Sequence, residues 1–530
     1  MANFNTINAY DADARIPTFR GLMQYGDGIN ADPRYAMDAV NVATPAGVLQ
    51  PFASCLPAAW LLPAPIETLA FLYRRYPPAD GNSGSSAVLG NCIIGTMVLG
   101  QDGSATAGDK NILIAASDGA LYYLSASSHG WHQLPYPDGV DYYQSNKWSW
   151  CVYEINPEGS TAPVDVMLLS NAKDGMVMVR GDTMTVSAVN TPKKFGIIER
   201  YAERIWGGAI DDDSDMLVYS APYDPTNWEA TPEIPEDGAG DILQPSWDGD
   251  RFTALRSFGS QLIAFKRTRV WRVLGTDPGE YTFKEQYGGG APYASTIAVS
   301  GEKIYMLTPQ GIVYYDGVSV APFYQEYAME VFDRMTPTAI DGACACVFQG
   351  NYYCAIPIDG SEVNNAVLVY SEKDGTWLLR DDISVESFLA TEDSLYFTSA
   401  TTPGQYWTWR DDSWTCGDAT TAPVKWVTPW NDLNYKHYLK GGFEVYLTCE
   451  VKTTPVTLTV AIQTEKKIKE KKVTFLPLTE EEIEAGKTCK QKRMHFGGTG
   501  RRFRMIVSAT AQPPWRLVGG MMVKAEIDQD

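Results

Sequence analysis

The sequence predicts an all-β protein, an irregular β-propeller of roughly six to eight blades followed by a C-terminal β-sandwich. Two observations lead to this fold class. Short runs rich in Val, Ile, Tyr, Trp and Thr alternate with Asp-Gly, Gly-Asn and Pro-Asp turns along almost the whole chain, as strands joined by tight connections do. Corresponding strands also recur every 40 to 60 residues or so, which is the spacing of propeller blades rather than of solenoid coils.

The composition is that of a large globular protein. A chain of 530 residues with 45% hydrophobic and 20% charged residues is ordinary for a globular protein and long enough for more than one domain. No run of about 18 apolar residues is present, and residues 1–17 lack the basic flank and apolar stretch of a secretory signal. We therefore expect a chain that begins in the cytoplasm, does not insert into a membrane and keeps its nine scattered cysteines reduced.

Residues 1–50 are predicted to form an N-terminal extension and the first strand of the propeller. Helical spacing of charged and apolar residues is confined to two short stretches, residues 32–42 and 325–335. Residues 51–422 are predicted to form the propeller, because they repeat a unit of strand, turn, strand and aromatic-ended turn. Such a unit cannot bury both faces alone, so successive units would pack around an axis and leave only short edges. A chain of β-sandwiches is the alternative architecture.

Residues 423–530 are predicted to form a separate β-sandwich. A linker-like stretch at residues 417–429 precedes longer strand patterns, over a length typical of one domain. The charge balance changes at the same place. Residues 423–530 hold 18 Lys and Arg against 12 Asp and Glu, a balance of +6, which leaves 25 against 52, or −27, for residues 1–422. This asymmetry indicates a domain boundary and two different roles.

Motifs of catalysis are missing from the sequence. It contains no GxSxG, HExxH, GxxxxGK[ST] or CxxC. The glycine-rich residues 287–295 are followed by a strand pattern and not by a helix that would hold phosphate, so we predict a turn between blades. None of the four histidines adjoins a Ser or Cys nucleophile. We predict a protein without enzymatic activity or a cofactor, although many paired carboxylates leave glycoside hydrolysis as an alternative.

An aspartate cluster is the one weak candidate for a metal site. Asp211, Asp213 and Asp215 occupy the first, third and fifth positions of a calcium-binding loop. The sixth position is Met216, where the loop needs glycine, and the twelfth is Pro222, where a glutamate belongs. The flanking residues have the pattern of paired strands. We therefore predict the tip of a β-hairpin, with calcium binding as the alternative.

Three cysteines could form part of a second kind of metal site. Cys344 and Cys346 fall on one face of a predicted strand, and a three-residue loop at residues 349–351 would bring Cys354 opposite Cys346. No fourth ligand lies nearby in the sequence. Because thiols are commonly buried in protein cores, we predict core residues.

Basic residues gather in the last hundred residues of the chain. Alternation in residues 501–508 places Arg502 and Arg504 on one strand face and Phe503 and Met505 on the other. This face is either simply solvated or docks an acidic partner by charge complementarity. The predicted partner-docking basic face comprises Lys466, Lys467, Lys469, Lys471, Lys472, Arg502 and Arg504.

Residues 15–420 resemble the tail nozzle, or head-to-tail hub, β-propeller proteins of short-tailed bacteriophages. The resemblance rests on the order of several segments and not on a single diagnostic motif. These segments are "FRGLMQYGDGINADPRYAMDAVNVATPAGVLQPFAS" at 19–54, "RIWGG" to "DPTNW" at 204–228, "GSQLIAFKRTRVWRV" at 259–273, "GEKIYMLTPQGIVYYDG" at 301–317 and "NAVLVYSEKDGTWLLRD" at 365–381.

The resemblance implies a non-enzymatic structural protein of the virion tail, assembled in the host cytoplasm. Six copies would form a homo-oligomeric ring next to the portal, adaptor and tail proteins, and the genomic DNA would pass through it without sequence-specific binding. Excess carboxylate on the channel wall would repel phosphate, so that DNA does not adhere. The more basic C-terminal domain would dock an acidic neighbour. The alternatives are a receptor- or carbohydrate-binding adhesin and, further, a propeller glycoside hydrolase.

Overall fold

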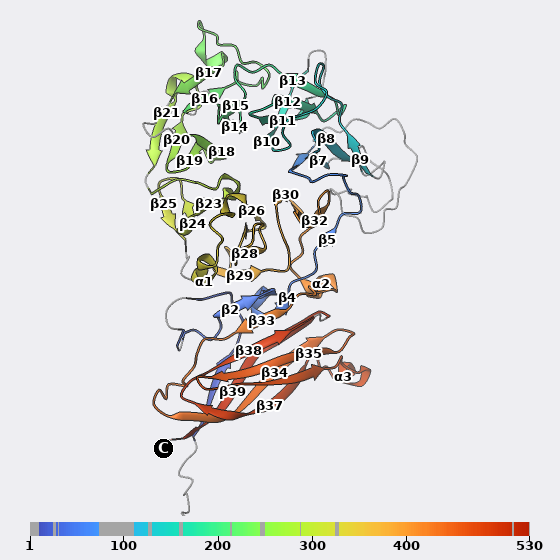
Figure 1. Ribbon diagram of the computed structural model, residues 1–530, viewed down its shortest axis with the longest axis vertical. Helices are drawn as coiled ribbons and strands as arrows, with labels where there is room; N and C mark the ends of the chain where they lie inside the picture. The colour runs from blue at the N-terminus through green and yellow to red at the C-terminus, as the bar shows by residue number, and fades with distance from the viewer. Residues whose placement is uncertain are drawn as a thin grey trace, which may run out of the picture.

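The fold is described by a computed structural model in which β-strands dominate (Figure 1). The structure describes residues 10–24, 28–29, 31–73, 111–125, 130–157, 163–211, 215–243, 250–286, 288–323, 328–510 and 513–528. A propeller occupies the upper part of Figure 1 and a β-sandwich the lower part. The predicted fold class is thereby confirmed.

The propeller consists of seven four-stranded antiparallel blades within the described ranges. The first strands of six of the seven pairs of neighbouring blades contact one another, so they line the central axis. Blade 1 comprises β6 (Thr68–Tyr73), β7 (Asn111–Ser117), β8 (Ala120–Ser125) and β9 (Gly130–Gln133), and blade 2 comprises β10 (Ser149–Ile155), β11 (Val164–Asn171), β12 (Gly175–Arg180) and β13 (Val186–Val189). Blade 3 comprises β14 (Ile197–Tyr201), β15 (Arg204–Gly208), β16 (Met216–Tyr219) and β17 (Gly240–Leu243). Blade 4 comprises β18 (Phe252–Phe258), β19 (Gln261–Lys266), β20 (Val270–Leu274) and β21 (Thr282–Gln286).

The last three blades close the circle with a strand from the start of the chain. Blade 5 comprises β22 (Ala298–Ser300), β23 (Lys303–Thr308), β24 (Gly311–Tyr315) and β25 (Val320–Pro322). Blade 6 comprises β26 (Cys344–Phe348), β27 (Asn351–Ile356), β28 (Ala366–Ser371) and β29 (Thr376–Arg380). Blade 7 comprises β30 (Ser387–Ala390), β31 (Leu395–Thr398), β32 (Tyr406–Thr408) and β5 (Leu56–Pro57). Trp407 pairs with Pro57 and Thr408 with Leu56. Blade 7 therefore joins the two ends of the propeller.

The sandwich consists of a four-stranded sheet and a five-stranded half-sheet. Their inner faces meet in one core, to which β34, β35, β38 and β39 all contribute buried residues. In order of pairing, the first sheet is β1 (Tyr10–Ile16), β39 (Trp515–Asp528), β34 (Leu439–Val451) and β37 (Lys490–Gly500), and the half-sheet is β2 (Asp38–Val40), β33 (Val424–Val427), β38 (Phe503–Ala509), β35 (Val456–Thr464) and β36 (Ile468–Phe475).

The remaining elements are short. A two-stranded ribbon, β3 (Val42–Ala43) and β4 (Gln50–Pro51), lies between the two domains in the chain. The helices are α1 (Met329–Asp333), α2 (Ser413–Cys416) and α3 (Glu480–Glu484), with 3₁₀ turns η1 (Pro45–Gly47), η2 (Pro235–Asp237), η3 (Pro278–Glu280), η4 (Ala294–Thr296) and η6 (Ile340–Gly342). Of the two predicted helical stretches, residues 325–335 contain α1.

The N-terminal residues differ from the prediction. The sequence predicts an extension and a first propeller strand in residues 1–50, but β1 pairs with β39 and β2 with β33, both in the sandwich. Residues 32–42 contain β2 and not a helix. The physical reason is tertiary, because pairing with strands from the far end of the chain overrides a weak local periodicity.

A continuous sheet couples the two domains. Strand β2 pairs with β33 on one side and lies parallel to β29 of blade 6 on the other, where Val40 faces Leu379. Blade 6 and the half-sheet are thus one nine-stranded sheet. Movement of the sandwich against the propeller would break backbone hydrogen bonds, so we expect the two domains to move as one body.

A buried arginine lies where these parts meet. The side chain of Arg380, at the end of β29, is fully buried and donates from Nε to Asp382 Oδ1 at 2.6 Å. Its Nη2 donates to Ala53 O at 2.9 Å, and its Nη1 to Arg410 O at 3.2 Å. The guanidinium also lies over the rings of Phe52 and Trp409, at 5.0 and 4.7 Å from their centroids. Arg380 therefore links Phe52 and Ala53, which precede strand β5, to blades 6 and 7.

Replacing Arg380 with alanine is expected to lower the free energy of unfolding by about 3–5 kcal/mol, because the Asp382 carboxylate would stay buried without its partner. Urea denaturation followed by tryptophan fluorescence measures the loss. Arg251→Ala is the control, since Arg251 and its partner Asp211 are both more than half exposed and such pairs contribute about 1 kcal/mol at most. Equal losses in the two variants would contradict the role given to Arg380.

Candidate docking surface

The outer face of the half-sheet carries part of the predicted basic face. Side chains of Phe503, Met505 and Val507 are buried, whereas Arg504 and Ser508 alternate with them toward solvent. The predicted alternation along this strand is thus confirmed. Lys472 on β36 faces Thr459 on β35, and Thr459 faces Ser508 on β38. Paired residues of neighbouring strands point to the same side of a sheet, so these three side chains share the outer face.

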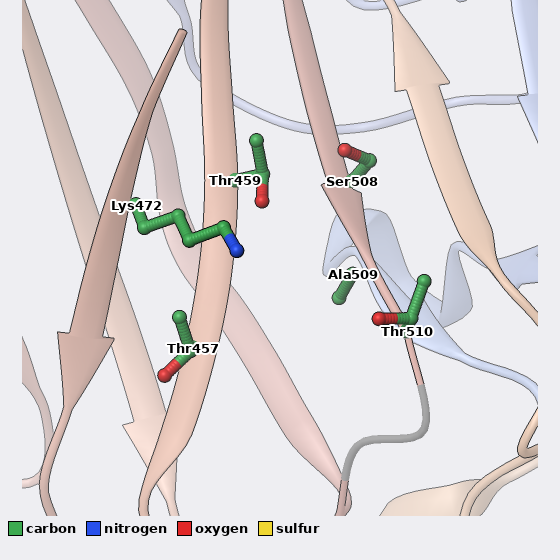
Figure 2. A pocket seen from close by; sticks show the side chains of 6 residues that line it. All are labelled: Thr457, Thr459, Lys472, Ser508, Ala509 and Thr510. Atoms are coloured by element: carbon green, nitrogen blue, oxygen red, sulfur yellow. The ribbon is translucent and has the colours of Figure 1, made fainter.

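A shallow hollow of about 250 Å³ lies on this face (Figure 2). Figure 2 shows Lys472 reaching from β36 across β35, where Thr457 and Thr459 lie, with Ser508 and Thr510 on the far side. Four hydroxyl groups and one ammonium group therefore surround the hollow. Hydroxyl and ammonium groups donate hydrogen bonds to carboxylate or phosphate oxygens, so the hollow suits an anionic group.

A second lysine extends the same row of side chains. Lys425 on β33 faces Ser508, and its Nζ donates to Asp38 Oδ2 at 2.8 Å. The row thus runs Lys472, Thr459, Ser508, Lys425 across four strands. Sequence reasoning missed Lys425 and the hydroxyls. The alternating threonines of residues 457–459 were a signal for an exposed strand face, but only the register of β38 shows which residues they meet.

Arg502 and Arg504 share an aromatic platform. Their guanidinium groups lie 5.5 and 4.8 Å from the centroid of the Trp430 ring, within the range of cation–π attraction. Arg504 Nε donates to Gln463 Oε1 at 2.8 Å, and Arg502 lies 3.5 Å from the Glu465 carboxylate. Burial lowers the pKa of Arg504, and the carboxylates of Asp38 and Glu330 raise it in part. Both arginines are held in place rather than extended into solvent.

The remaining predicted lysines lie elsewhere. Lys466 and Lys467 belong to the turn between β35 and β36, where Thr464 N donates to Lys467 O at 2.9 Å. Lys469 and Lys471 face Ile462 and Val460, and so point to the other side of the half-sheet from Lys472. Lys471 Nζ lies 5.7 Å from the ring of Phe496 in the opposite sheet. The basic run is therefore divided between a turn, an edge and the outer face, because the side chains of a strand alternate.

The aspartate cluster lies in the connection between β15 and β16, which pair as a hairpin. Asp211 lies 3.9 Å from Arg251 of blade 4. Asp215 pairs with the fully buried Lys266, whose ammonium group also lies 4.8 Å from the Phe252 ring. Asp213 lies outside the described residues. Two of the three carboxylates thus have cationic partners on the next blade, which favours a bond between blades over a calcium loop.

The three cysteines do not converge on one site. A two-residue turn, Gln349–Gly350, joins β26 to β27, so Cys346 faces Tyr353 and Cys354 faces Ala345. The predicted three-residue loop was wrong by one residue, and a slip of one residue sends a side chain to the other face of the sheet. Cys344 and Cys346 lie in one core cluster and Cys354 in another. Burial raises the pKa of the Cys344 and Cys346 thiols.

No group of three or more His, Cys, Asp and Glu side chains is arranged to hold a metal ion in the part of the chain that the structure describes. Among the same residues, no helix has both the length and the apolar character needed to cross a membrane.

Comparisons with known proteins add little to this description. No protein-family model matches the chain, and no curated protein matches it. Two solved structures of BBS1N in complex with ARL6DN, soaked with mercury and with lead, align at 10% identity over 57% of this chain and 88% and 87% of theirs, with TM-scores of 0.36 and 0.34. The Neurospora crassa Pan2 WD40 domain aligns at 8% identity over 57% of this chain and 72% of that chain, with a TM-score of 0.26. Scores this low carry no argument about function.

Thiol labelling tests the placement of the cysteines. Iodoacetamide at pH 8 is expected to modify the exposed Cys416 in the folded protein, more slowly than a free thiol because partial burial raises its pKa. Cys344, Cys346 and Cys354 are expected to react only after unfolding, because thiolates are the reactive form and full burial suppresses them. Peptide mass spectrometry with and without urea measures the difference. Rapid labelling of Cys354, or its protection by added Zn²⁺, would contradict the assignment to the core.

Proposed function

We propose that this chain is a non-enzymatic structural protein of a phage tail, one subunit of a homo-oligomeric nozzle or head-to-tail connector ring through which DNA passes. The observation that carries the proposal is the separation of charge along a chain whose two domains share one sheet. Residues 1–422 have a balance of −27 and residues 423–530 a balance of +6, and a nine-stranded sheet joins the two parts. The order of segments that resembles nozzle proteins adds support.

The acidic propeller suits a channel wall. Carboxylates facing the lumen repel the phosphates of DNA, so the double helix is not held by ion pairs as it moves. A protein that bound DNA tightly would need the opposite balance. The proposal thus includes a lumen lined mainly by Asp and Glu, and a lumen lined by Lys and Arg would contradict it.

The sandwich suits a docking domain. Its outer face presents the hollow around Lys472 and the neighbouring guanidinium groups of Arg502 and Arg504. An acidic neighbour, such as a portal, adaptor or tail protein, would place carboxylates against these donors. Because the sandwich shares a sheet with blade 6, docking at this face would also fix the orientation of the propeller axis relative to the docked protein.

The oligomeric state tests the proposal. Size-exclusion chromatography with light scattering is expected to give a closed assembly, with six copies as the expected number, and electron-microscopic class averages are expected to show a ring with an open lumen. A stable monomer at concentrations of about 100 μM would contradict the ring. If that monomer also bound members of a glycan array, the adhesin alternative would replace the proposal.

The docking face has its own test. Binding to poly-L-glutamate at low salt is expected to weaken by about threefold to tenfold in Lys472→Glu, because a repulsive charge replaces the only ammonium group at the hollow. Lys173→Glu, an exposed substitution on the propeller, is the matched control. Fluorescence anisotropy of a labelled polymer measures both affinities, and raising the salt concentration should reduce the difference. Equal weakening in both variants would remove the hollow from the proposal.

A further inference from the structure

An exposed loop with one apolar residue at its tip stands out from blade 3. The loop, Thr231–Gly238, joins β16 to β17, and every residue from 229 to 237 is exposed. Ile234 keeps 49% of its surface exposed, and Pro232 and Pro235 lie on either side of it in the chain. Glu233, Glu236 and Asp237 surround it with three carboxylates. Single exposed apolar residues are common on protein surfaces. This one is set apart by the three carboxylates around it, which combine apolar area with negative charge at one loop tip.

The structure holds this loop in one shape from inside. The fully buried Arg204 of β15 donates from Nη1 to Ser220 O at 2.8 Å and to Gly238 O at 2.6 Å, and from Nη2 to Glu236 O. A Cβ atom on Gly238 would lie 2.4 Å from Thr231 N, so the two ends of the loop cross at close range. A loop ordered before binding loses little conformational entropy when it docks.

An apolar groove lies between blades 4 and 5 on the same propeller. It has a volume of about 570 Å³, within the range of sites that take a side chain or a short segment. Its apolar walls come from Pro292 and Val313 and from the outer strand β25, and Thr268 and Gln310 lie at its rim.

Glycines keep the groove open. Gly288 and Gly290 pack against backbone atoms of the two blades and leave no room for a side chain. A Cβ atom on Gly288 would lie 2.3 Å from Val320 O, and one on Gly290 would lie 2.3 Å from Arg269 N. Gly289 between them has nothing within 4 Å of its Cβ position. Residues 288–290 of the predicted turn therefore form a floor without side chains, on which an incoming side chain can lie.

One cation lies at the groove. Arg267 is exposed and lines it, and its guanidinium has no carboxylate within ion-pair distance in the described part of the chain. Its neighbours Lys266 and Arg269 do have acidic partners, Asp215 and Glu285. The Asp250 carboxylate lies at the same turn but accepts from the backbone N–H groups of Arg267 and Thr268 at 3.3 and 2.9 Å. The groove thus combines an apolar pocket with a guanidinium outside any ion pair of the described residues, which matches an apolar residue flanked by carboxylates.

We propose that the groove of one copy receives Ile234 of a second copy, with Glu233 and Glu236 of the second copy facing Arg267 of the first. The loop cannot enter its own groove. Arg204 holds it in place, and η2 of the loop contacts η3, which lies beyond the end of β20 farthest from Arg267. The contact joins two different patches, so it adds subunits head to tail and closes into a ring where the rotation allows.

The overall charge makes such a local match necessary. Each copy carries −21, so two copies repel one another at long range. A contact between copies needs apolar burial together with opposite charges at short range, and this loop and this groove supply both. The inference rests on the proposed ring and names its interface.

A charge swap tests the interface. The double variant Glu233→Lys/Glu236→Lys and the single variant Arg267→Glu are each expected to raise the concentration needed for assembly by about tenfold or more, because like charges then meet across the contact. A chain carrying all three substitutions is expected to assemble nearly as the original chain does. Glu302→Lys, an exposed reversal in the turn between β22 and β23, is the control. Light scattering across a dilution series measures assembly, and circular dichroism checks that each variant folds.

A cross-link gives an independent reading that does not depend on charge. In a Cys416→Ser background, Ile234→Cys combined with Gln310→Cys is expected to form disulfide-linked chains under mild oxidation, and peptide mass spectrometry identifies the bond. Ile234→Cys combined with Glu302→Cys should give no such bond.

The outcomes separate this inference from the proposed function. Rings that persist unchanged in every charge variant, without the specific cross-link, would overturn the interface and leave the nozzle proposal standing. Open chains that respond to the charge swap but never close would support the interface and overturn the nozzle. A monomer at all concentrations would overturn both. Assembly lost in the single reversals and regained in the triple variant would support both.

Discussion

The interaction on which the rest of this structure depends is the buried contact of Arg380 with Asp382. The pair lies where the end of blade 6, the start of blade 7 and the segment that precedes the closing strand β5 meet. A cation without water must find all its partners in the protein, and Arg380 finds them in Asp382 and in the carbonyls of Ala53 and Arg410. These partners come from three separate parts of the chain. The guanidinium therefore specifies how the propeller closes, in addition to any stability that it contributes.

The closure also explains the path of the N-terminus. The chain first adds β1 to the four-stranded sheet of the sandwich, then β2 to the half-sheet, and only afterwards reaches blade 7 with β5. The sandwich thus contains strands from both ends of the chain, and the propeller, from β5 to β32, is a continuous segment inserted between them. Such non-local pairing makes folding slower than in a protein of local contacts, but it leaves no single linker at which the sandwich could swing. A ring subunit that must keep its lumen and its docking face in fixed relation benefits from this arrangement.

Strand positions and the propeller class could be predicted from the sequence, because alternation and turn residues are local signals. Three features could not. The partners of β1 and β2 lie more than 330 residues away, which no local pattern encodes. The turn at Gln349–Gly350 differs by one residue from the prediction, and that residue decides which core Cys354 enters. The basic run was predicted as one face, but Lys471 and Lys472 face opposite sides of the half-sheet because they are neighbours on a strand. In each case the missing information is a register between distant strands.

Charge acts on two length scales in this molecule. Over tens of ångströms the excess of carboxylate keeps copies apart and keeps phosphate at a distance, an effect that salt weakens beyond roughly 10 Å. Within contact distance, individual cations decide where another molecule can approach. Some exposed cations of the propeller have acidic partners, as Arg251 and Arg269 do, whereas Arg267 at the groove and Lys472 at the hollow line open cavities. A cation beside a cavity can meet an acidic group of another molecule at short range, so the positions of these two side chains constrain how the chain can assemble more than its net charge does.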